Sequence, residues 1–255
     1  MFWVPLLLVT WVAAAVSCAR LCLAAVEAAR PAPPGAVDRE RELSLYEAAF
    51  LAGGPQRVTD LALLSMHRRR RVWLAHTGWT TVVDPDPAGA DDLERSVIGA
   101  IGPEGQSRTA AVRAAASAAE AVRALADRLV ASGLAVPDAA RTAVAGAVRG
   151  VRRATLLTVV LAAGAALLLP AGHAPDARNM AWFALPLVLT LGCLVIARVE
   201  VHPYTRWASP AGQSLLRRVG GGDPLTAVAI GGVRALDDPA LRAALAPAPR
   251  RAPRL

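Results

Sequence analysis

Lysine is absent from this chain, and arginine supplies all 28 basic side chains against 20 acidic ones, which gives a net charge of +8. A shift from lysine codons to arginine and alanine codons is typical of GC-rich genomes. The basic composition therefore does not by itself indicate a nucleic-acid or lipid ligand. Only the positions of the arginines along the chain can do so.

Aromatic residues are also few, at 4% of the 255 residues, although 55% of the residues are hydrophobic. Alanine and leucine dominate the hydrophobic residues, and both favour helix over strand. We therefore predict a mainly α-helical fold.

Residue patterns for catalysis and metal binding are missing. The three cysteines, Cys18, Cys22 and Cys193, lie in apolar stretches, and their odd number argues against a disulfide framework or a zinc site. Cys18 and Cys22 are one helical turn apart, which fits two small residues of a membrane helix or an acylated pair. No two histidines have the spacing of a helical metal site, Gly53-Gly54-Pro55 lacks the ending of a phosphate-binding loop, and no serine occupies a nucleophile elbow. We assign no catalytic residue, cofactor or metal.

Charged residues are missing from three hydrophobic runs of roughly 18–19 residues, close to the length that spans the ~30 Å hydrocarbon core as a helix. The absence of intramembrane charge argues against a pump or transporter. The predicted organisation is transmembrane helix 1 (1–26), a linker (27–37), a cytoplasmic helical domain (38–153), transmembrane helix 2 (154–172), an external loop (173–179), transmembrane helix 3 (180–197) and a cytoplasmic tail (198–255).

The orientation is predicted from arginine placement. Several arginines follow the first run, precede the second and follow the third, whereas the loop over 173–179 contains only Arg178. The positive-inside rule then places the middle segment and the tail in the cytoplasm and the N-terminus outside. A cleaved secretory signal is the alternative for the first run, but no basic residue precedes Arg20, so we favour an uncleaved anchor in the cell membrane.

Capping and turn signals predict the start of the helical domain. Ser44 and Glu47 form a capping-box pattern in a helix over 42–51, which Gly53 and Gly54 end before Pro55 opens a second helix.

Two strands, 72–75 and 79–83, follow with a turn at 76–78. Two helices followed by a hairpin is the order seen in winged-helix modules. The predicted fold is therefore mainly α, with three transmembrane helices and a cytoplasmic helical domain that contains one β-hairpin and is winged-helix-like.

Further helices are predicted from the same signals. They are a short helix over 92–101, a long alanine-rich helix over 107–132 closed by Gly133, a helix from Pro137 into the second span, and two tail helices opened by Asp223-Pro224 and Asp238-Pro239. Residues 247–255 are predicted to be disordered.

Residues 43–58 read Leu-Ser-Leu-Tyr-Glu-Ala-Ala-Phe-Leu-Ala-Gly-Gly-Pro-Gln-Arg-Val. This stretch resembles the signature of an uncharacterised family of bacterial membrane proteins common in actinomycetes, in which Tyr/Glu-Ala-x-Leu-x-Gly-Gly-Pro marks the cytoplasmic domain. Residues 227–239 also look like the closing segment of that family. The resemblance implies the N-terminal span, the helical cytoplasmic domain and a paired span beyond it. It implies no chemistry, and the Gly- and Cys-rich tail of some relatives is replaced here by Pro, Ala and Arg.

The densest basic cluster is Arg68, Arg69, Arg70 and Arg71, directly after His67. These arginines could contact the phosphate of a lipid or a nucleic acid, or they could simply be solvated at the negative end of a helix dipole. Because basic and acidic residues are nearly equal in number across the middle segment, nucleic acid is the less favoured ligand.

The leading functional hypothesis is a non-enzymatic membrane protein whose cytoplasmic domain binds a protein partner or a second copy of itself. The alternative is a membrane-tethered, winged-helix-like regulator that binds nucleic acid.

Overall fold

The computed structural model describes residues 3–28, 41–84, 89–167, 177–200, 207–220 and 222–246. The chain forms two compact units, each built from two separate segments. Unit 1 comprises residues 1–30 and 136–206, and unit 2 comprises residues 31–135 and 207–255. As predicted, the fold is mainly helical.

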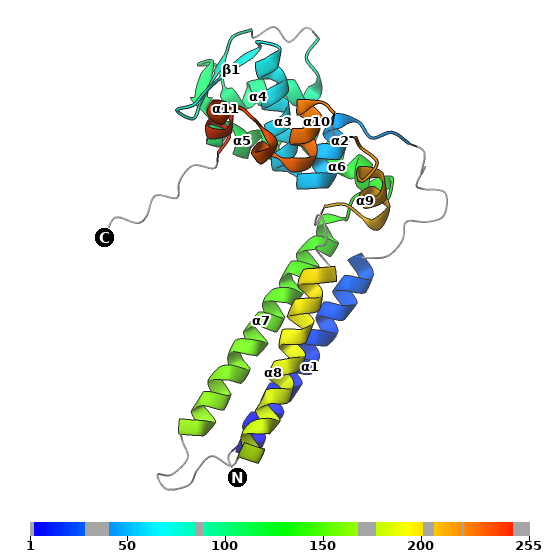
Figure 1. The fold of residues 1–255 in the computed structure, drawn as a ribbon, viewed down its shortest axis with the longest axis vertical. Helices are drawn as coiled ribbons and strands as arrows, with labels where there is room; N and C mark the ends of the chain where they lie inside the picture. Colours follow the sequence, from blue (N-terminus) through cyan, green and yellow to red (C-terminus); the bar gives the residue numbers. More distant parts are fainter. Residues whose placement is uncertain are drawn as a thin grey trace, which may run out of the picture. The chain divides into compact units, whose positions relative to one another are not determined.

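Unit 1 consists of three helices that lie side by side, namely α1 (Trp3–Ala28), α7 (Asp138–Leu167) and α8 (Ala177–Glu200) (Figure 1). Leu21 of α1 and Val151 of α7 are buried against each other, and Cys193 and Leu194 of α8 pack on them. Buried threonines on each helix donate to a carbonyl one turn earlier, so they leave no hydroxyl unpaired. These bonds are Thr10 to Leu7, Thr158 to Ala154 and Thr190 to Pro186.

One helix among the described residues is long and apolar enough to cross a membrane, from Val4 to Glu27. This supports the first of the three predicted spans. In α8 the apolar stretch Ala184–Ile196 is shorter, and the run predicted over 154–172 continues into residues 168–176, which lie outside the described residues. The prediction of three spans is therefore supported for one helix only.

Unit 2 begins with two helices, α2 (Leu45–Gly53) and α3 (Pro55–Arg68). The predicted capping box is confirmed: the Ser44 hydroxyl accepts from the Glu47 amide, and the Glu47 carboxylate accepts from the Ser44 amide at 2.9 Å. Gly54 ends α2 and begins α3 with a φ of 76°, and a Cβ there would lie 2.1 Å from the Trp207 ring. Only glycine therefore fits this turn.

A three-stranded antiparallel sheet follows, with strand order β1-β2-β3. Strands β1 (Val72–Ala75) and β2 (Trp79–Val82) form the predicted hairpin, with Trp73 opposite Thr81. Helix α4 (Asp92–Ile101) has the predicted bounds. The prediction of a lone hairpin is wrong, because β3 (Gln106–Arg108) pairs with β2.

The prediction of one helix over 107–132 is also wrong. After β3 the chain forms α5 (Thr109–Ser117) and α6 (Glu120–Ala131), separated by Ala119 in an extended conformation. The break allows α5 to bury Val112 and Ala116 in one hydrophobic cluster and α6 to bury Val122, Leu125 and Leu129 in another. Alanine-rich sequence favours helix locally, but the two clusters require a change of direction.

The C-terminal residues belong to the same two clusters. They form α9 (Pro210–Leu216), α10 (Pro224–Gly231), a 3₁₀ turn (Val233–Ala235) and α11 (Pro239–Ala244). Asp223 and Asp238 cap α10 and α11, as predicted. The buried hydrophobic residues of this segment are Ala208, Leu215, Val228, Ala229, Leu236, Ala244 and Leu245. Residues 207–246 thus complete the core of unit 2, whereas the boundaries drawn from the sequence separated this segment from residues 38–153.

A short junction joins the two segments of unit 2. Ala135 and Ala208 form an isolated antiparallel bridge, and the Ser209 amide donates to the Leu134 carbonyl at 2.8 Å. The Ser209 hydroxyl donates to the Gly133 carbonyl at 2.7 Å and accepts from the Gly212 amide at 3.1 Å, which caps α9. The helices α7 and α8 are therefore an insertion between two hydrogen-bonded chain positions of unit 2.

Gly212→Ala tests this junction. A Cβ at this residue would lie 2.2 Å from the Leu134 carbonyl oxygen. We expect the variant to lower the free energy of unfolding by about 1–3 kcal/mol, because the backbone of the junction must move. The measurement is denaturant unfolding of the detergent-solubilised protein. Gly99→Ala is the control, since its Cβ meets nothing within 4 Å, and it should leave stability unchanged or increase it by up to about 1 kcal/mol. Equal stability of the two variants would contradict the role of the junction.

Candidate functional site

The arginine cluster forms the turn between α3 and β1. The Arg70 amide donates to the His67 carbonyl and the Arg71 amide to the Met66 carbonyl, which is the hydrogen-bond pattern of a Schellman motif. Arg70 occupies the left-handed position of the motif with a φ of 59°. Glycine usually fills that position, so an arginine there adds backbone strain of order 1 kcal/mol.

Glu94 takes up two of the four arginines. Its side chain is 0% exposed, and its carboxylate accepts from Arg69 at 3.0 Å and from Arg71 at 2.5 Å. Asp91 holds Glu94 in the first turn of α4 by accepting from the Glu94 amide at 2.7 Å. A buried carboxylate needs such partners, because desolvation of an unpaired charge costs several kcal/mol. Arg69 and Arg71 therefore hold α4 against the α3–β1 turn.

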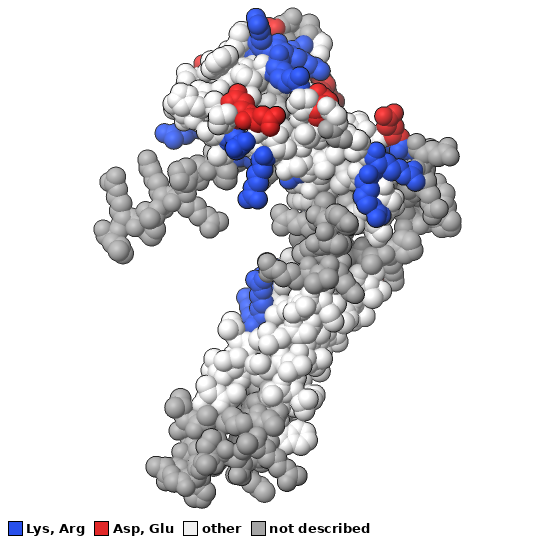
Figure 2. Space-filling view, in the orientation of Figure 1, with Lys and Arg blue, Asp and Glu red and all other residues white. Residues whose placement is uncertain are grey.

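The other two arginines are directed to solvent. Arg68 lies 3.6 Å from Asp223, and both side chains are about half exposed, so this pair contributes little to stability. Arg70 is exposed and has no ion-pair partner among the described residues. Figure 2 shows arginine side chains gathered at the end of unit 2 where α3 and β1 lie, with acidic side chains beside them (Figure 2). Of the four arginines predicted to contact phosphate, Arg68 and Arg70 are thus the two that Glu94 does not bind.

The sheet presents an exposed apolar face that we did not predict. In the described part of unit 2, the exposed large hydrophobic side chains are Trp73 at 61%, Val83 at 58% and Trp79 at 38%. Trp73 and Trp79 alternate with the buried Leu74 and Thr80, so the tryptophans lie on the outer face. The signal was present in the sequence as this period-two alternation. We call Trp73, Trp79, Val83 and Arg108 the sheet face.

Two cationic or ring contacts hold the tryptophans of the sheet face. The Arg108 guanidinium lies 5.5 Å from the centre of the Trp79 ring, and Arg108 is the cross-strand partner of Trp79. The His67 ring meets Trp73 edge-on at a centroid distance of 5.3 Å. These contacts fix two large aromatic surfaces in place before any partner arrives, which lowers the entropy lost on binding.

The free edge of β1 is occupied by the same histidine. The His67 Nδ1 lies 3.2 Å from the Val72 carbonyl oxygen and 3.4 Å from the Leu74 amide nitrogen. Edge groups that are already covered are poor templates for an added strand. A strand added at β1 would therefore have to displace His67.

Every buried carboxylate in the described residues is bound to arginine. Glu94 is one case, Glu47 pairs with Arg41, and Asp60 pairs with Arg113 through two bonds, one of 2.8 Å. Burial raises the pKa of Asp60, and the Arg113 guanidinium opposes that rise. The described residues also hold no cluster of three side chains that could bind a metal. The buried acids thus serve as ion-pair partners that join elements of the fold.

No protein-family model, curated protein or solved structure matches this chain. The resemblance to the actinomycete-type membrane family therefore stays a prediction.

Glu94→Gln is expected to lower the free energy of unfolding by about 3 kcal/mol, because it leaves Arg71 partly buried without a full counter-charge. Arg71→Gln should cost more than Arg69→Gln, since the Arg71 side chain is 20% exposed and that of Arg69 is 61% exposed. Arg70→Gln is the matched control and should change stability by less than about 0.5 kcal/mol. Denaturant unfolding of the four variants gives the order. A cost for Arg70→Gln as large as that for Arg71→Gln would contradict the assignment of these arginines.

Proposed function

We propose that this protein is a membrane-anchored interaction protein without catalytic activity, whose cytoplasmic unit 2 binds a protein partner or a second copy of itself through the sheet face. The main observation in support of this proposal is the exposure of the sheet face. This face gathers the exposed large hydrophobic side chains of unit 2 on one hairpin, while the buried acids are engaged by arginine.

The alignment of charges in unit 1 supports three spans. Leu21 and Val151 pack together, Arg20 directly precedes Leu21, and Arg153 follows Val151 by two residues. Helices α1 and α7 run antiparallel, so a step back along α1 and a step forward along α7 go in the same direction. At 1.5 Å per residue, Arg20 lies about 1.5 Å and Arg153 about 3 Å from the Leu21–Val151 contact in that direction. Figure 2 shows one group of basic side chains on the otherwise uncharged surface, on the side of α7. A shared level of arginines is expected where helices leave a bilayer on the cytoplasmic side.

The apolar lengths agree with that boundary. From Arg20 back to Trp3, α1 extends about 26 Å, and from Ala177 to Leu194, α8 extends the same distance. Both values approach the ~30 Å hydrocarbon core. In this proposal all three helices span the cell membrane, with the N-terminus and the loop around residue 175 outside and unit 2 in the cytoplasm.

The sheet face is suited to protein recognition. Tryptophan and arginine are enriched among the residues that contribute most binding energy at the centre of protein interfaces. Trp73 and Trp79 supply broad apolar surface, and Arg108 supplies charge beside Trp79. The partner we expect therefore offers an apolar patch with acidic residues at its border.

A nucleic-acid partner is the second candidate. Exposed tryptophans next to arginine can stack bases, and the helix–helix–hairpin order supports the winged-helix comparison. Against it, the Glu94 carboxylate pairs with both Arg69 and Arg71 and offsets one of their two positive charges, which removes charge that a phosphate backbone would need. The resemblance to the actinomycete-type membrane family supports the architecture equally under both candidates.

Reporter fusions test the topology. Fusions of a periplasm-active and a cytoplasm-active reporter at residues 90, 175 and 250 should report inside, outside and inside. A single span would instead place residues 90, 175 and 250 on the same side. That result would remove α7 and α8 from the bilayer and reverse this part of the proposal.

Site-specific photo-crosslinking tests the sheet face. A photoreactive amino acid at Trp73 or Val83 in the full-length protein should give a discrete protein adduct in cells, including an adduct of dimer size if the partner is a second copy. The same group at Arg123, on α6, is the control and should give none. Trp79→Ala should reduce the adduct at residue 73 at least several-fold, because aromatic anchors dominate binding energy. Adducts only to nucleic acid, lost between 50 and 200 mM salt, would select the second candidate.

A further inference from the structure

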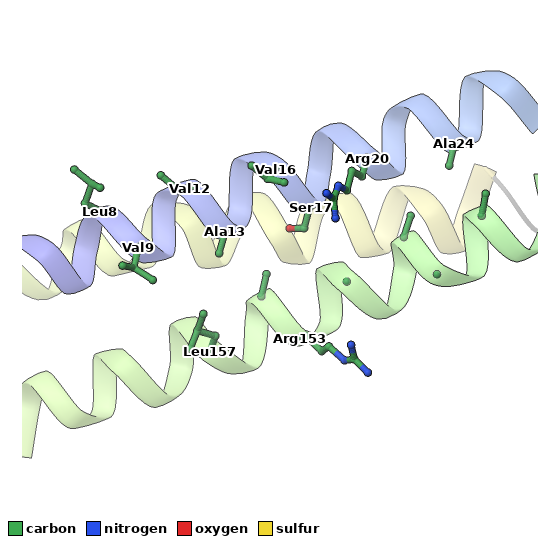
Figure 3. Close-up of a pocket in the computed structure, with 15 residues that line it drawn as sticks. Leu8, Val9, Val12, Ala13, Val16, Ser17, Arg20, Ala24, Arg153 and Leu157 are labelled. Atoms are coloured by element: carbon green, nitrogen blue, oxygen red, sulfur yellow. The ribbon is translucent and has the colours of Figure 1, made fainter.

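A groove runs between α1 and α7 within unit 1, with a volume of about 910 Å³. On α1 it is lined by large apolar side chains such as Val12 and Val16, and on α7 by small residues such as Gly146 and Gly150. Figure 3 shows α8 behind the two facing helices, so the groove is open on one long side (Figure 3). The two glycines widen the end of the groove toward Ala24, whereas Val12 and Val16 line the other end, near Leu157.

One level of this apolar groove is basic. Arg20 and Arg153 both line it, and both side chains are exposed. In Figure 3, Arg20 projects from α1 toward the gap, while Arg153 stands at the rim on the α7 side and points outward. Ser17 lies one turn from Arg20 and adds a hydroxyl beside the arginines, although its hydroxyl donates to the Ala14 carbonyl.

The dimensions below the arginines match one leaflet of a bilayer. On α1 the groove extends from Arg20 to Leu8, which is about 18 Å at 1.5 Å per residue. Half of the ~30 Å hydrocarbon core is about 15 Å. An acyl chain that starts at the arginine level would therefore reach the centre of the membrane within the groove.

We propose that this groove binds an anionic phospholipid of the cytoplasmic leaflet, with one acyl chain along Val12 and Val16 and the headgroup phosphate between Arg20 and Arg153. The proposal rests on the three-span topology, because only that topology places the groove in a bilayer. Charge complementarity selects the occupant: a second copy of this chain would bring the same arginines, whereas an anionic headgroup is attracted by both.

Two glycines allow a steric test without strain. A Cβ at Gly150 meets nothing within 4 Å, and one at Gly146 meets only the end of the Arg149 side chain at 4.0 Å. Leucine at residue 150, which lies three residues from Arg153 on the side away from Leu157, would fill the groove beside the arginines, where the phosphate would lie, and leave the backbone in place. Gly164 is a matched control, because it lies on the same helix, does not line the groove and also has nothing within 4 Å of its Cβ.

The experiment is native mass spectrometry of the full-length protein, purified from the membrane fraction in detergent containing equal amounts of phosphatidylglycerol and phosphatidylcholine. The wild-type protein should retain phosphatidylglycerol at least fivefold over phosphatidylcholine. Each of Arg20→Gln and Arg153→Gln should reduce that preference about fivefold, which corresponds to about 1 kcal/mol per arginine near a membrane surface. Arg152→Gln, which removes the same charge from a residue outside the groove, should reduce it by less than twofold.

Gly150→Leu should reduce retention of both lipids, and Gly164→Leu should reduce neither. Equal retention of the two lipids by the wild-type protein would overturn the proposal, as would an effect of Arg152→Gln equal to that of Arg153→Gln. A dimer that Gly150→Leu dissociates would show that a second copy fills the groove and would also overturn it. Absence of the wild-type protein from the membrane fraction would instead contradict the anchoring on which the groove depends, and the reporter fusions identify that case separately.

Discussion

Unit 2 depends on the junction between residues 133–135 and 207–212. The Ala135–Ala208 bridge and the two bonds of Ser209 bring together chain segments that are separated by about 70 inserted residues, 136–206. Closing so long a connection costs conformational entropy, which only the buried apolar surface of α9 to α11 can offset. The two segments of unit 2 therefore stabilise one fold together: without residues 207–246, the clusters around α2 and α3 would lose Val228, Ala229 and Leu245.

Ion pairs serve the same purpose inside unit 2. Glu94 joins α4 to the α3–β1 turn, and Asp60 joins α3 to α5 through Arg113. Breaking a buried pair is costly because the remaining charge is left desolvated. This explains why two of the four arginines in the run over residues 68–71, Arg69 and Arg71, stabilise the fold although the run resembles a phosphate-binding patch. Our two proposals therefore place the function elsewhere, at the sheet face of unit 2 and at the groove of unit 1.

Local signals predicted much of the fold. Residues next to an element predicted where it begins or ends. Examples are the capping box at Ser44, the bounds of α4 and the Asp-Pro starts of α10 and α11. Long-range contacts were beyond reach. Neither the pairing of β3 with β2 nor the division of the alanine-rich stretch into α5 and α6 has a local signal, because each depends on which distant cluster a side chain enters. The same limit hid the Glu94 partner of Arg69 and Arg71, which lies 23 to 25 residues away.

The central claim, that one domain is interrupted by a helical insertion, can be tested by removing the insertion. Residues 41–246 with 136–206 replaced by a two-residue turn should form a soluble helical protein that unfolds in one cooperative transition, since bridged residues lie about 4.5–5.5 Å apart and a tight turn can join them. Residues 41–135 alone should fail to fold, because part of the core is missing. The measurement is circular dichroism during thermal unfolding of both proteins. If residues 41–135 unfolded cooperatively at the same temperature as the joined protein, the C-terminal segment would be an accessory and the account would be wrong.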